Sequence, residues 1–565
     1  MADKSKTKIH PAVPELANQL AKGDIDRREF LRTATLLGVS ASAAYAMAGG
    51  VTGSQFVPSA QAATPKKGGN LRCSMQVQRM DDPATYEWTQ MSNTSRPFLE
   101  YLTITGTDNV TRPYLCERWE ASDDLKTWTL HMRKGVKWSN GDAFDAEDAA
   151  FNFRRWLDPK TGSSNIGLFG SMVTETDTGK KDKGGNPIKS KSMTPGAVEV
   201  VDKHTLRLNL NRPELAMPEN LYNYPTAIVH RRFEEEGGNI SKNPVGTGPF
   251  ELKEFKVGEK AVLAKRNPKD YWGDEVYLDQ ITYVDHGDDP AAGLAALASG
   301  QVELLYETFV EQLEVVQGIP GTQLFEAVTA QTGVARMQID KKPFDDIRVR
   351  QAVTLCQDHQ RLLDIAYRGK GAPAEDHHVA PTHPEYAKLP AQKQDYARAK
   401  KLLADAGHPN GIDLKLDCKK TPSWEPALAQ ALSEMCKPAG IRIQINVMPD
   451  AQYWKTWDKT PFGFTAWTHR PLGVMVLNLG YRSGVPWNES HYNNPAFDSA
   501  LDVASATLDV EERRKQMAKV EKILQDDAVI AQPLWRSVFA AGTERVRGYE
   551  LHPTIYHQLG KVWLA

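Results

Sequence analysis

The segment that follows residues 462–467 has residue types suited to holding a small charged molecule. It reads Trp467-Thr468-His469-Arg470-Pro471-Leu472-Gly473 and contains no acid. Arginine can hold a carboxylate or another anion through two parallel hydrogen bonds, and tryptophan adds apolar or stacking surface. Trp467, Thr468, His469 and Arg470 are therefore side chains that could contact a ligand. The alternative is a structural role in which Arg470 pairs with an acid of the core.

Lys420, Trp424 and Trp88 are further side chains that could contact a ligand. Trp424 stands near the predicted start of a helix, and Lys420 shortly precedes it. Trp88 lies in the loop-like stretch 82–93, where it and Tyr86 are expected to be exposed. Three other tryptophans are expected to lie in the core rather than on a binding surface: Trp454, Trp457 and Trp487.

No metal site is expected, although one segment superficially suggests it. Asp376, His377, His378 and His383 lie on a proline-rich stretch. They lack the fixed spacing that metal ligands show in known sites. The stretch is therefore predicted to be a solvated loop.

The sequence predicts neither catalysis nor a bound cofactor. It contains no dinucleotide fingerprint, haem-attachment motif, H-E-x-x-H zinc motif or G-x-S-x-G nucleophile elbow. The glycine-rich stretch 245–249 is not a phosphate loop, because no Lys-Ser/Thr follows and Pro249 removes a donor that such a loop needs. We expect a binding protein; an exported oxidoreductase with a cofactor is the alternative from another class.

Residues 112–157 predict a compact α+β unit with no catalytic residues. Its middle strand alternates apolar and polar residues with the period of a half-buried strand, and the apolar ones are Trp128, Leu130 and Met132. Asn140-Gly141 is a turn dipeptide. Asp145 can then cap a helix whose apolar residues share one face.

This unit resembles the extracytoplasmic solute-binding proteins of peptide-type ABC importers, the family of oligopeptide, dipeptide and nickel-complex receptors. The resemblance rests on residues at fixed offsets: Pro113, Glu117, Trp119, Glu120, Asp124, Trp128, Arg133-Lys134-Gly135-Val136, Trp138, Asn140-Gly141, Phe144 and Ala146-Glu147-Asp148. Later stretches match the family in the same order, among them 243–250, 267–273 and 343–353.

The resemblance implies an α/β, two-lobed periplasmic-binding-protein (Venus-flytrap) fold with an extra α+β domain in the N-terminal lobe. The implied boundaries are 66–112 with 238–330 and 536–565 for the N-terminal lobe, 113–237 for the extra domain and 331–535 for the C-terminal lobe. Two crossovers, near 329–338 and 531–539, would join the lobes. Closure about such crossovers is the hinge motion expected of periplasmic receptors.

The resemblance also implies capture of a small-molecule ligand between the lobes and its delivery to an inner-membrane ABC permease. The resemblance implies ligand contacts at Trp467, Thr468, His469 and Arg470, and it places Trp424, with Lys420 beside it, near the ligand contacts of the dipeptide receptors. In the family's peptide receptors, the loop that corresponds to 467–473 supplies an aspartate for the peptide's α-ammonium, and this loop has none. We therefore expect a peptide-like ligand that is anionic or has a blocked amine. Within the same fold, a receptor for a metal chelate or a sugar-derived compound is the alternative.

The N-terminus predicts export to the periplasm. Arg27-Arg28 is followed by a mildly apolar run from Thr33 to Ala48, and residues 60–62 fit a small-residue cleavage pattern. We expect residues 1–62 to be a twin-arginine signal peptide cleaved near Ala62, with a plain amphipathic helix as the alternative. The run is too short and too rich in small residues for stable membrane insertion.

Length, charge and cysteine content set further bounds. A chain of 565 residues is too long for one core, and its formal charge of −2 gives no indication of a nucleic-acid partner. The five cysteines include no C-x-x-C pair, so buried reduced thiols are expected. The first cysteine, Cys73, lies beyond the predicted cleavage site, so we expect a protein that is free in the periplasm rather than anchored by a lipid. We also expect it to be a monomer.

Overall fold

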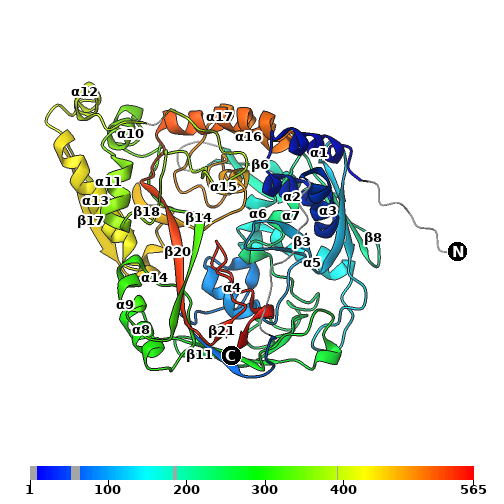
Figure 1. Ribbon diagram of the computed structural model, residues 1–565. Coiled ribbons are helices and arrows are strands. Elements are labelled where there is room, and N and C mark those ends of the chain that lie inside the picture. The colour runs from blue at the N-terminus through cyan, green and yellow to red at the C-terminus, as the bar shows by residue number, and fades with distance from the viewer. Residues whose placement is uncertain (1–8, 53–63, 182–186, 391) are drawn as a thin grey trace.

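One mixed β-sheet runs through both halves of the molecule (Figure 1). The computed structural model describes residues 9–52, 64–181, 187–390 and 392–565. Within them, the main path of the sheet has the order β10-β11-β12-β1-β13-β20-β14-β18-β16-β17. These strands are β1 (Asn70–Ser74), β10 (Phe250–Lys256), β11 (Lys260–Lys265), β12 (Gln280–Val284), β13 (Leu304–Leu305), β14 (Thr322–Met337), β16 (Ile412–Lys419), β17 (Ile441–Met448), β18 (Phe462–Trp467) and β20 (Leu534–Thr543). This sheet, with helices around it, confirms the predicted α/β class.

The long antiparallel strands β14 and β20 connect the two halves. β1 and β10–β13 lie on one side of the pair, and β16–β18 lie on the other. The pairing is interrupted between Ala327 and Gln331, where three residues of β14 face one residue of β20. Such a bulge bends the strand and leaves the extra residues unpaired. Inside it, the Ala330 N–H donates to His469 Nδ1 at 2.9 Å instead of to the neighbouring strand.

Parallel strands on both sides of this pair determine where a ligand can lie. In the first half, β1 is parallel to β12 and β13. In the second, β16 is parallel to β17 and β18. Ligands of open α/β sheets bind at the carboxyl ends of such strands.

Several helices belong to the second half, and among them the helix 424–436 packs on the strands β16, β17 and β18. The helices are α10 (Ile347–Thr354), α11 (His359–Tyr367), α12 (Tyr396–Asp405), α13 (Trp424–Cys436), α15 (Gly473–Gly480), α16 (Pro495–Ala506) and α17 (Val510–Asp527). The sequence predicts helix caps at Asp345 and Asp395 and a helix start at Pro426, and Asp395 does cap α12. Two other predicted starts are wrong by one or two positions: Asp346, not Asp345, caps α10, and α13 begins at Trp424, not at Pro426. Either neighbouring residue could begin a helix, so the sequence alone did not decide between them.

The α+β unit predicted over residues 112–157 is present. A four-stranded sheet in the order β4-β5-β9-β8 packs against α5 (Ala146–Trp156), and its strands are β4 (Cys116–Ala121), β5 (Thr127–Met132), β8 (Val198–Asp202) and β9 (Thr205–Asn209). The apolar side chains that alternate along β5 are buried. Asp145 caps α5, as predicted, and its side chain accepts a hydrogen bond from the Glu147 N–H at 3.0 Å. The sequence also predicts a surface insertion or hairpin tip over 174–192, because this stretch has almost no apolar residues. The structure places the hairpin of β6 (Val173–Lys181) and β7 (Pro187–Met193) there.

Two predictions in the first half are wrong. The sequence predicts a helix around 95–102, after the loop-like stretch, but the helix lies earlier, as α4 (Thr89–Ser95). The sequence of α4 is polar and has no apolar stripe from which a helix could be predicted. In the structure its hydroxyl groups are buried all the same, because they donate hydrogen bonds to the helix's own backbone. Tyr86 is buried rather than exposed, and Trp88 is half-buried. A short 3-10 turn capped by Asp82 directs the chain inward just before Tyr86.

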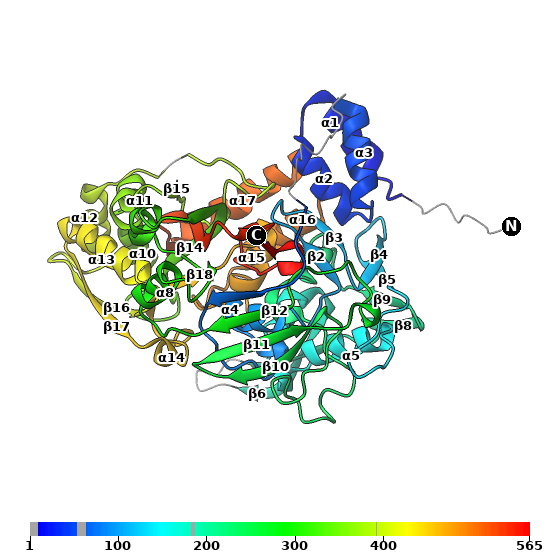
Figure 2. The same ribbon diagram turned by 60° about the horizontal axis from the view of Figure 1, so that its bottom comes forward.

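The N-terminal segment packs on the body as three helices (Figure 2). They are α1 (Val13–Lys22), α2 (Arg27–Leu36) and α3 (Ala41–Thr52). The apolar side chains of α2 belong to the same core as residues of both halves. The predicted cleavage site at 60–62 lies outside the described residues. In the described part of the chain, no helix is long and apolar enough to cross a membrane.

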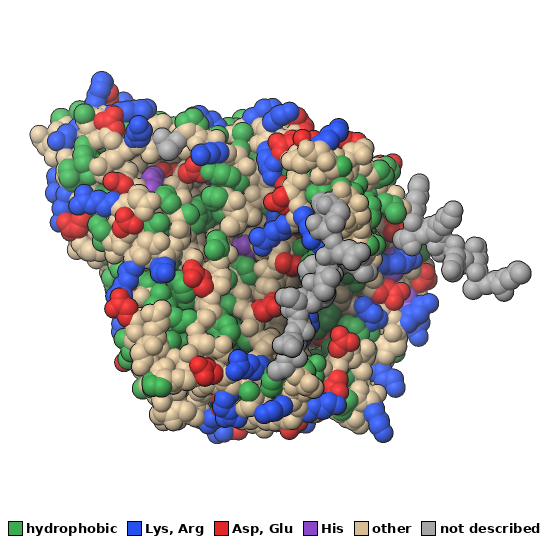
Figure 3. Space-filling view, viewed as in Figure 1, with side chains coloured by type: hydrophobic (Ala, Val, Ile, Leu, Met, Phe, Trp, Pro, Cys, Tyr) green, Lys and Arg blue, Asp and Glu red, His purple; other side chains and the backbone are tan. Residues whose placement is uncertain are grey.

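The cysteines and the surface charges follow the composition. All five cysteines are buried and free, which confirms the expectation of reduced thiols. Burial raises the pKa of the Cys116 thiol to about 12, so this thiol stays protonated at neutral pH. Figure 3 shows cationic and anionic side chains interspersed over one face, as the small formal charge leads one to expect.

Candidate ligand-binding site

A cavity of about 630 Å³ lies between the two halves of the sheet. Segments that follow β1, β12 and β13 form part of its wall, and segments that follow β16, β17 and β18 form another part. The cavity therefore lies at the carboxyl ends of parallel strands from both halves, the place where such sheets bind ligands. Its wall is rich in tryptophan: Trp88, Trp424, Trp454, Trp457, Trp467 and Trp487.

Trp467 ends β18 and anchors the loop that follows. Its indole Nε1 donates to Glu489 Oε1 at 2.8 Å. Glu489 also pairs with Arg336, with 3.1 Å between Oε2 and Nε, and both side chains are buried. Burial raises the pKa of Glu489, and the Arg336 charge opposes that shift. Because a buried pair is costly to break, this arrangement fixes the Trp467 ring in the cavity wall.

His469 holds the same loop from behind. Its Nδ1 accepts the Ala330 N–H at 2.9 Å, so we assign the ring proton to Nε2, which donates to Asn109 Oδ1 at 3.0 Å. Burial lowers the pKa of His469 well below its usual range, so the ring is neutral. Both nitrogens are engaged, and His469 does not line the cavity. The sequence predicted a ligand contact here, whereas the geometry gives His469 a positioning role.

Arg470 is a buried cation of the cavity wall, with 3% of its surface exposed. Its Nη1 lies 3.4 Å from the Thr468 carbonyl oxygen and 3.3 Å from Thr468 Oγ1, and its guanidinium carbon lies 5.7 Å from the centre of the Trp467 ring. Nε and Nη2 have no hydrogen-bond partner among the residues that the structure describes. The predicted alternative, a pair with a core acid, is therefore not found in the described chain. A buried guanidinium with open N–H groups is suited to an anion.

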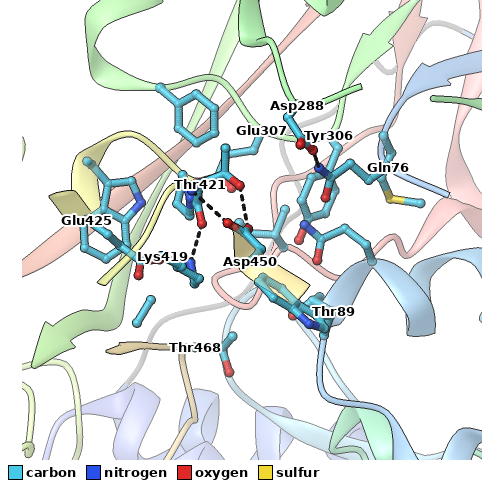
Figure 4. Close-up of a pocket in the computed structure, with 18 of the residues that line it drawn as sticks. Gln76, Thr89, Asp288, Tyr306, Glu307, Lys419, Thr421, Glu425, Asp450 and Thr468 are labelled. Atoms are coloured by element: carbon cyan, nitrogen blue, oxygen red, sulfur yellow. Dashed lines mark hydrogen bonds and ion pairs between the residues drawn. The ribbon is translucent and has the colours of Figure 1, made fainter. Parts of the chain in front are cut away.

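Another cation of the wall, Lys419, is already neutralised. It forms a buried ion pair with Glu425 and donates to the Thr421 carbonyl oxygen at 2.6 Å (Figure 4). Its ammonium also lies 5.3 Å from the ring centre of Trp88 and 6.0 Å from that of Trp454, within the range of cation–π attraction. Burial raises the pKa of Glu425 to about 7, and the Lys419 charge opposes the shift.

Other charged groups of the wall are also engaged. Arg536 of β20 pairs with Glu307 at 2.6 Å. Asp450 accepts hydrogen bonds from Thr421 N–H at 3.1 Å and from Thr421 Oγ1 at 2.5 Å (Figure 4). Lys420 is exposed, so water and salt screen its charge. Arg470 differs from these groups in being a buried cation that has no carboxylate partner among the described residues.

The structure brings together six of the seven predicted contact residues at the cavity: Trp88, Lys420, Trp424, Trp467, Thr468 and Arg470. Three further tryptophans were predicted to belong to the core, but Trp454 and Trp457 line the cavity instead. Trp487 lines the cavity too, although it also packs against the core as predicted. Trp454 follows α14 (Asp450–Tyr453), directly after the carboxyl end of β17. Because ligands of such sheets bind at the carboxyl ends of parallel strands, the place of Trp454 shortly after β17 could have predicted that it lines the cavity.

The segment from Asp376 to His383 is buried, so the prediction of a solvated loop is wrong. His383 Nε2 donates to the Arg470 carbonyl oxygen at 2.9 Å and thus supports the loop. His378 Nδ1 lies 2.7 Å from the Tyr481 hydroxyl. The polar partners that bury this segment come from distant parts of the chain, so its composition could not show them. Within the described residues, no group of three or more His, Cys, Asp or Glu side chains could hold a metal ion.

Known proteins with similar sequences are binding proteins by name. The chain is 28% identical over 515 residues to the periplasmic oligopeptide-binding protein OppA of Escherichia coli, a match that covers 86% of this chain and 90% of the relative. It is 26% identical over 473 residues to heme-binding protein A of Haemophilus influenzae, which covers 79% and 82%.

Solved structures share the fold. One is the Helicobacter pylori periplasmic binding protein DppA in complex with the peptide STSA, with a TM-score of 0.76, 22% identity, and coverage of 88% of this chain and 98% of that one. Another is AgaA of A. tumefaciens R10 with agropinic acid, with a TM-score of 0.77, 22% identity, and coverage of 88% and 99%. Both likenesses confirm the predicted two-lobed binding-protein fold. Residues 111–483 match the family described as bacterial extracellular solute-binding proteins, family 5 Middle, and the chain belongs to that family.

Proposed function

We propose that this protein is the substrate-binding component of an ABC import system, and that its ligand is a small peptide-like molecule with a carboxylate or another anion facing Arg470. The observation that carries this proposal is the buried Arg470 side chain, whose Nε and Nη2 have no partner among the described residues. A ligand anion would satisfy these donors with two parallel bonds. A free ammonium at the same place would meet a like charge, which costs several kcal/mol in a desolvated cleft.

The size and walls of the cavity support a small ligand with apolar or ring-like parts. Its volume of about 630 Å³ falls in the range typical of small-molecule pockets. The tryptophans of the wall offer flat apolar surface to the remainder of the ligand. Of the related folds, DppA was solved with a peptide and AgaA with agropinic acid. A blocked-amine peptide or an acidic conjugate of comparable size fits both the cavity and Arg470.

The proposal includes how the ligand is captured and passed on. The lobes are residues 66–112 with 238–330 and 536–565, which carry the extra domain 113–237, and residues 331–535. They close about β14 and β20, and the ligand favours the closed form that a membrane permease recognises. Residues 1–62 would direct export through the twin-arginine route to the periplasm, where the protein acts as a free monomer without catalysis or cofactor.

Calorimetry with matched probes tests the ligand class. The protein is unfolded and refolded to remove any co-purified ligand, and then titrated with Ala-Ala, N-acetyl-Ala-Ala and N-acetyl-Ala-Ala amide. We expect N-acetyl-Ala-Ala, which keeps its carboxylate and lacks the ammonium, to bind at least tenfold more tightly than either of the others. Tightest binding of unmodified Ala-Ala would contradict the proposal. A thermal-shift screen that adds metal chelates and oligosaccharides separates the alternative ligand classes, because bound protein melts higher.

A further inference from the structure

The N-terminal helical segment contacts the N-terminal lobe through polar groups as well as apolar packing. Trp119 Nε1 donates to the Leu36 carbonyl oxygen at 2.9 Å. Arg32 Nε donates to the Asn109 carbonyl oxygen at 3.3 Å, and the Arg32 side chain is buried. These bonds place the end of α2 on the turn between β2 (Thr103–Thr105) and β3 (Thr111–Pro113) and on β4.

The same segment also contacts the C-terminal lobe. Glu29, on the first turn of α2, pairs with Arg514 of α17 at 2.6 Å. Gln19 of α1 donates to the side chain of Asp509, which caps α17. Glu29 is 5% exposed, so this ion pair is largely shielded from water on one side. Residues 13–39 thus connect groups of the two lobes that are about 400 residues apart in the chain.

One of these contacts leads directly to the ligand cavity. Asn109 accepts Arg32 at its backbone oxygen and accepts His469 Nε2 at its side-chain oxygen, at 3.0 Å. His469 immediately precedes Arg470 and is held from its other side by Ala330. Two hydrogen bonds therefore separate the N-terminal segment from the loop that carries Arg470.

We propose that residues 13–39 occupy an interaction surface that spans both lobes, and that this segment, while attached, fixes the loop 468–473 through Asn109 and His469. The surface is complementary to the segment in charge, because Arg514 meets Glu29, and in shape around Trp119. A chain that carries the docked segment has a rigid binding loop. A chain whose segment is released has a looser loop and lobes that are free to separate.

The segment also lies against the body at a glycine. Gly38 has φ +89°, and a Cβ there would lie 2.4 Å from the Trp119 carbonyl oxygen. Gly23 has a similar φ of +79°, but a Cβ there would meet nothing within 4 Å. Both positions disfavour a side chain for backbone reasons, yet only Gly38 makes contact with the body. The pair therefore provides a matched test.

The test compares hydrogen exchange in the full chain for the parent, Gly38→Val and Gly23→Val. In Gly38→Val we expect amides of 27–37, the loop 468–473 and Ala330 to exchange roughly tenfold faster than in the parent. In Gly23→Val, exchange of the loop and of Ala330 should match the parent. Small-angle scattering without ligand should show a larger radius of gyration for Gly38→Val alone.

Several results would overturn the proposal. One is faster exchange in 27–37 with an unchanged loop, which would separate docking from the binding loop. Unchanged exchange in 27–37, or equal effects of both valines, would show that the Trp119 contact does not hold the segment. If Gly38→Val fails to fold, Arg32→Gln replaces it, and an unchanged loop in a released Arg32→Gln segment has the same meaning. No ligand is needed, so the outcome does not depend on the proposed ligand class.

Discussion

The indole rings of Trp88 and Trp454 meet edge to face beside the cavity, with their centroids 4.9 Å apart. Trp88 precedes α4 in the first half of the molecule, and Trp454 follows β17 in the second. The contact therefore exists only when the two halves are close together. Lys419 lies beside both rings and adds a cation–π attraction to this contact.

Replacing Trp454 should favour separation of the halves. Trp454→Ala removes the contact with Trp88, and aromatic pairs contribute about 0.5–1.5 kcal/mol beyond their buried area. We expect a larger radius of gyration without ligand and a return toward the parent value with a saturating ligand, measured by small-angle scattering. Trp457→Ala is the control, because Trp457 lines the same cavity but packs on Trp454 within its own half. Equal radii for the parent and Trp454→Ala would contradict the prediction.

Replacing Arg470 should weaken binding without unfolding the protein. Arg470→Ala should cost roughly 2–5 kcal/mol of ligand binding if the anion is buried against it. Arg470→Lys should lose less, because it keeps the charge but not the planar fork. Calorimetry with the tightest probe measures both. Arg482→Ala, which removes a pair with Asp502 outside the cavity, controls for a general effect of losing an arginine. Parent-like affinity in Arg470→Ala would return this residue to a structural role.

The buried Glu521 should make stability depend on pH. Burial raises its pKa from 4.5 to about 9, and the nearby charges of Glu375 and Glu385 add to the rise. Between these values the folded protein keeps the proton and the unfolded chain loses it, so the free energy of unfolding falls as pH rises. Glu521→Gln stays neutral and should remove this slope. At pH 8 the variant should therefore be more stable than the parent, by an amount on the order of a few kcal/mol.

Urea unfolding at pH 5, 7 and 8 measures the effect of Glu521→Gln. The difference between variant and parent should grow with pH and be smallest at pH 5. The exposed Glu235→Gln serves as a control, because it should not change the slope. A Glu521→Gln difference that is the same at all three values would mean that Glu521 is ionised in the folded protein.

Export should depend on the paired arginines of α2. Replacing Arg27-Arg28 by Lys-Lys keeps the charge, and the twin-arginine pattern predicts that the precursor then stays in the cytoplasm. Fractionation of cells that express the parent and the variant measures this. Lys22→Arg adds an arginine outside the pair and should be exported like the parent. Unchanged periplasmic yield of the Lys-Lys form would mean that the protein uses another route.

Local patterns predicted much of the fold. The alternation along β5 and the cap at Asp145 are patterns that each span only a few residues, and the structure confirms both. The fixed offsets around Trp119 are a longer run of neighbouring residues, and they indicated the correct family. The Arg470 loop could be placed because it follows a recognisable strand. The same reasoning failed at Trp454, whose residue type suits a core as well as a wall.

The rest depended on contacts between distant segments. Trp88 and Trp454 define part of the cavity only because the sheet brings the ends of β1, β12 and β13 close to the ends of β16 to β18. The burial of Asp376–His383 likewise depends on residues that come more than 100 positions later, such as Tyr481. Strand order decides both outcomes, and strand order is not a property of any short stretch.

The bulge in β14 gives the two-stranded connection a single compliant point. An unbroken antiparallel ladder resists bending along its whole length, whereas residues 328–330 have left the ladder, so we expect rotation of the lobes to concentrate there. The amide of Ala330, inside this pivot, is tied to His469. A ligand that moves Arg470 would therefore also move the bulge, because His469 precedes Arg470 and accepts the Ala330 N–H. Only the His469 side chain lies between the ligand-binding residue Arg470 and the bulge in β14. A movement of Arg470 would therefore reach the hinge without rearrangements elsewhere in the lobe.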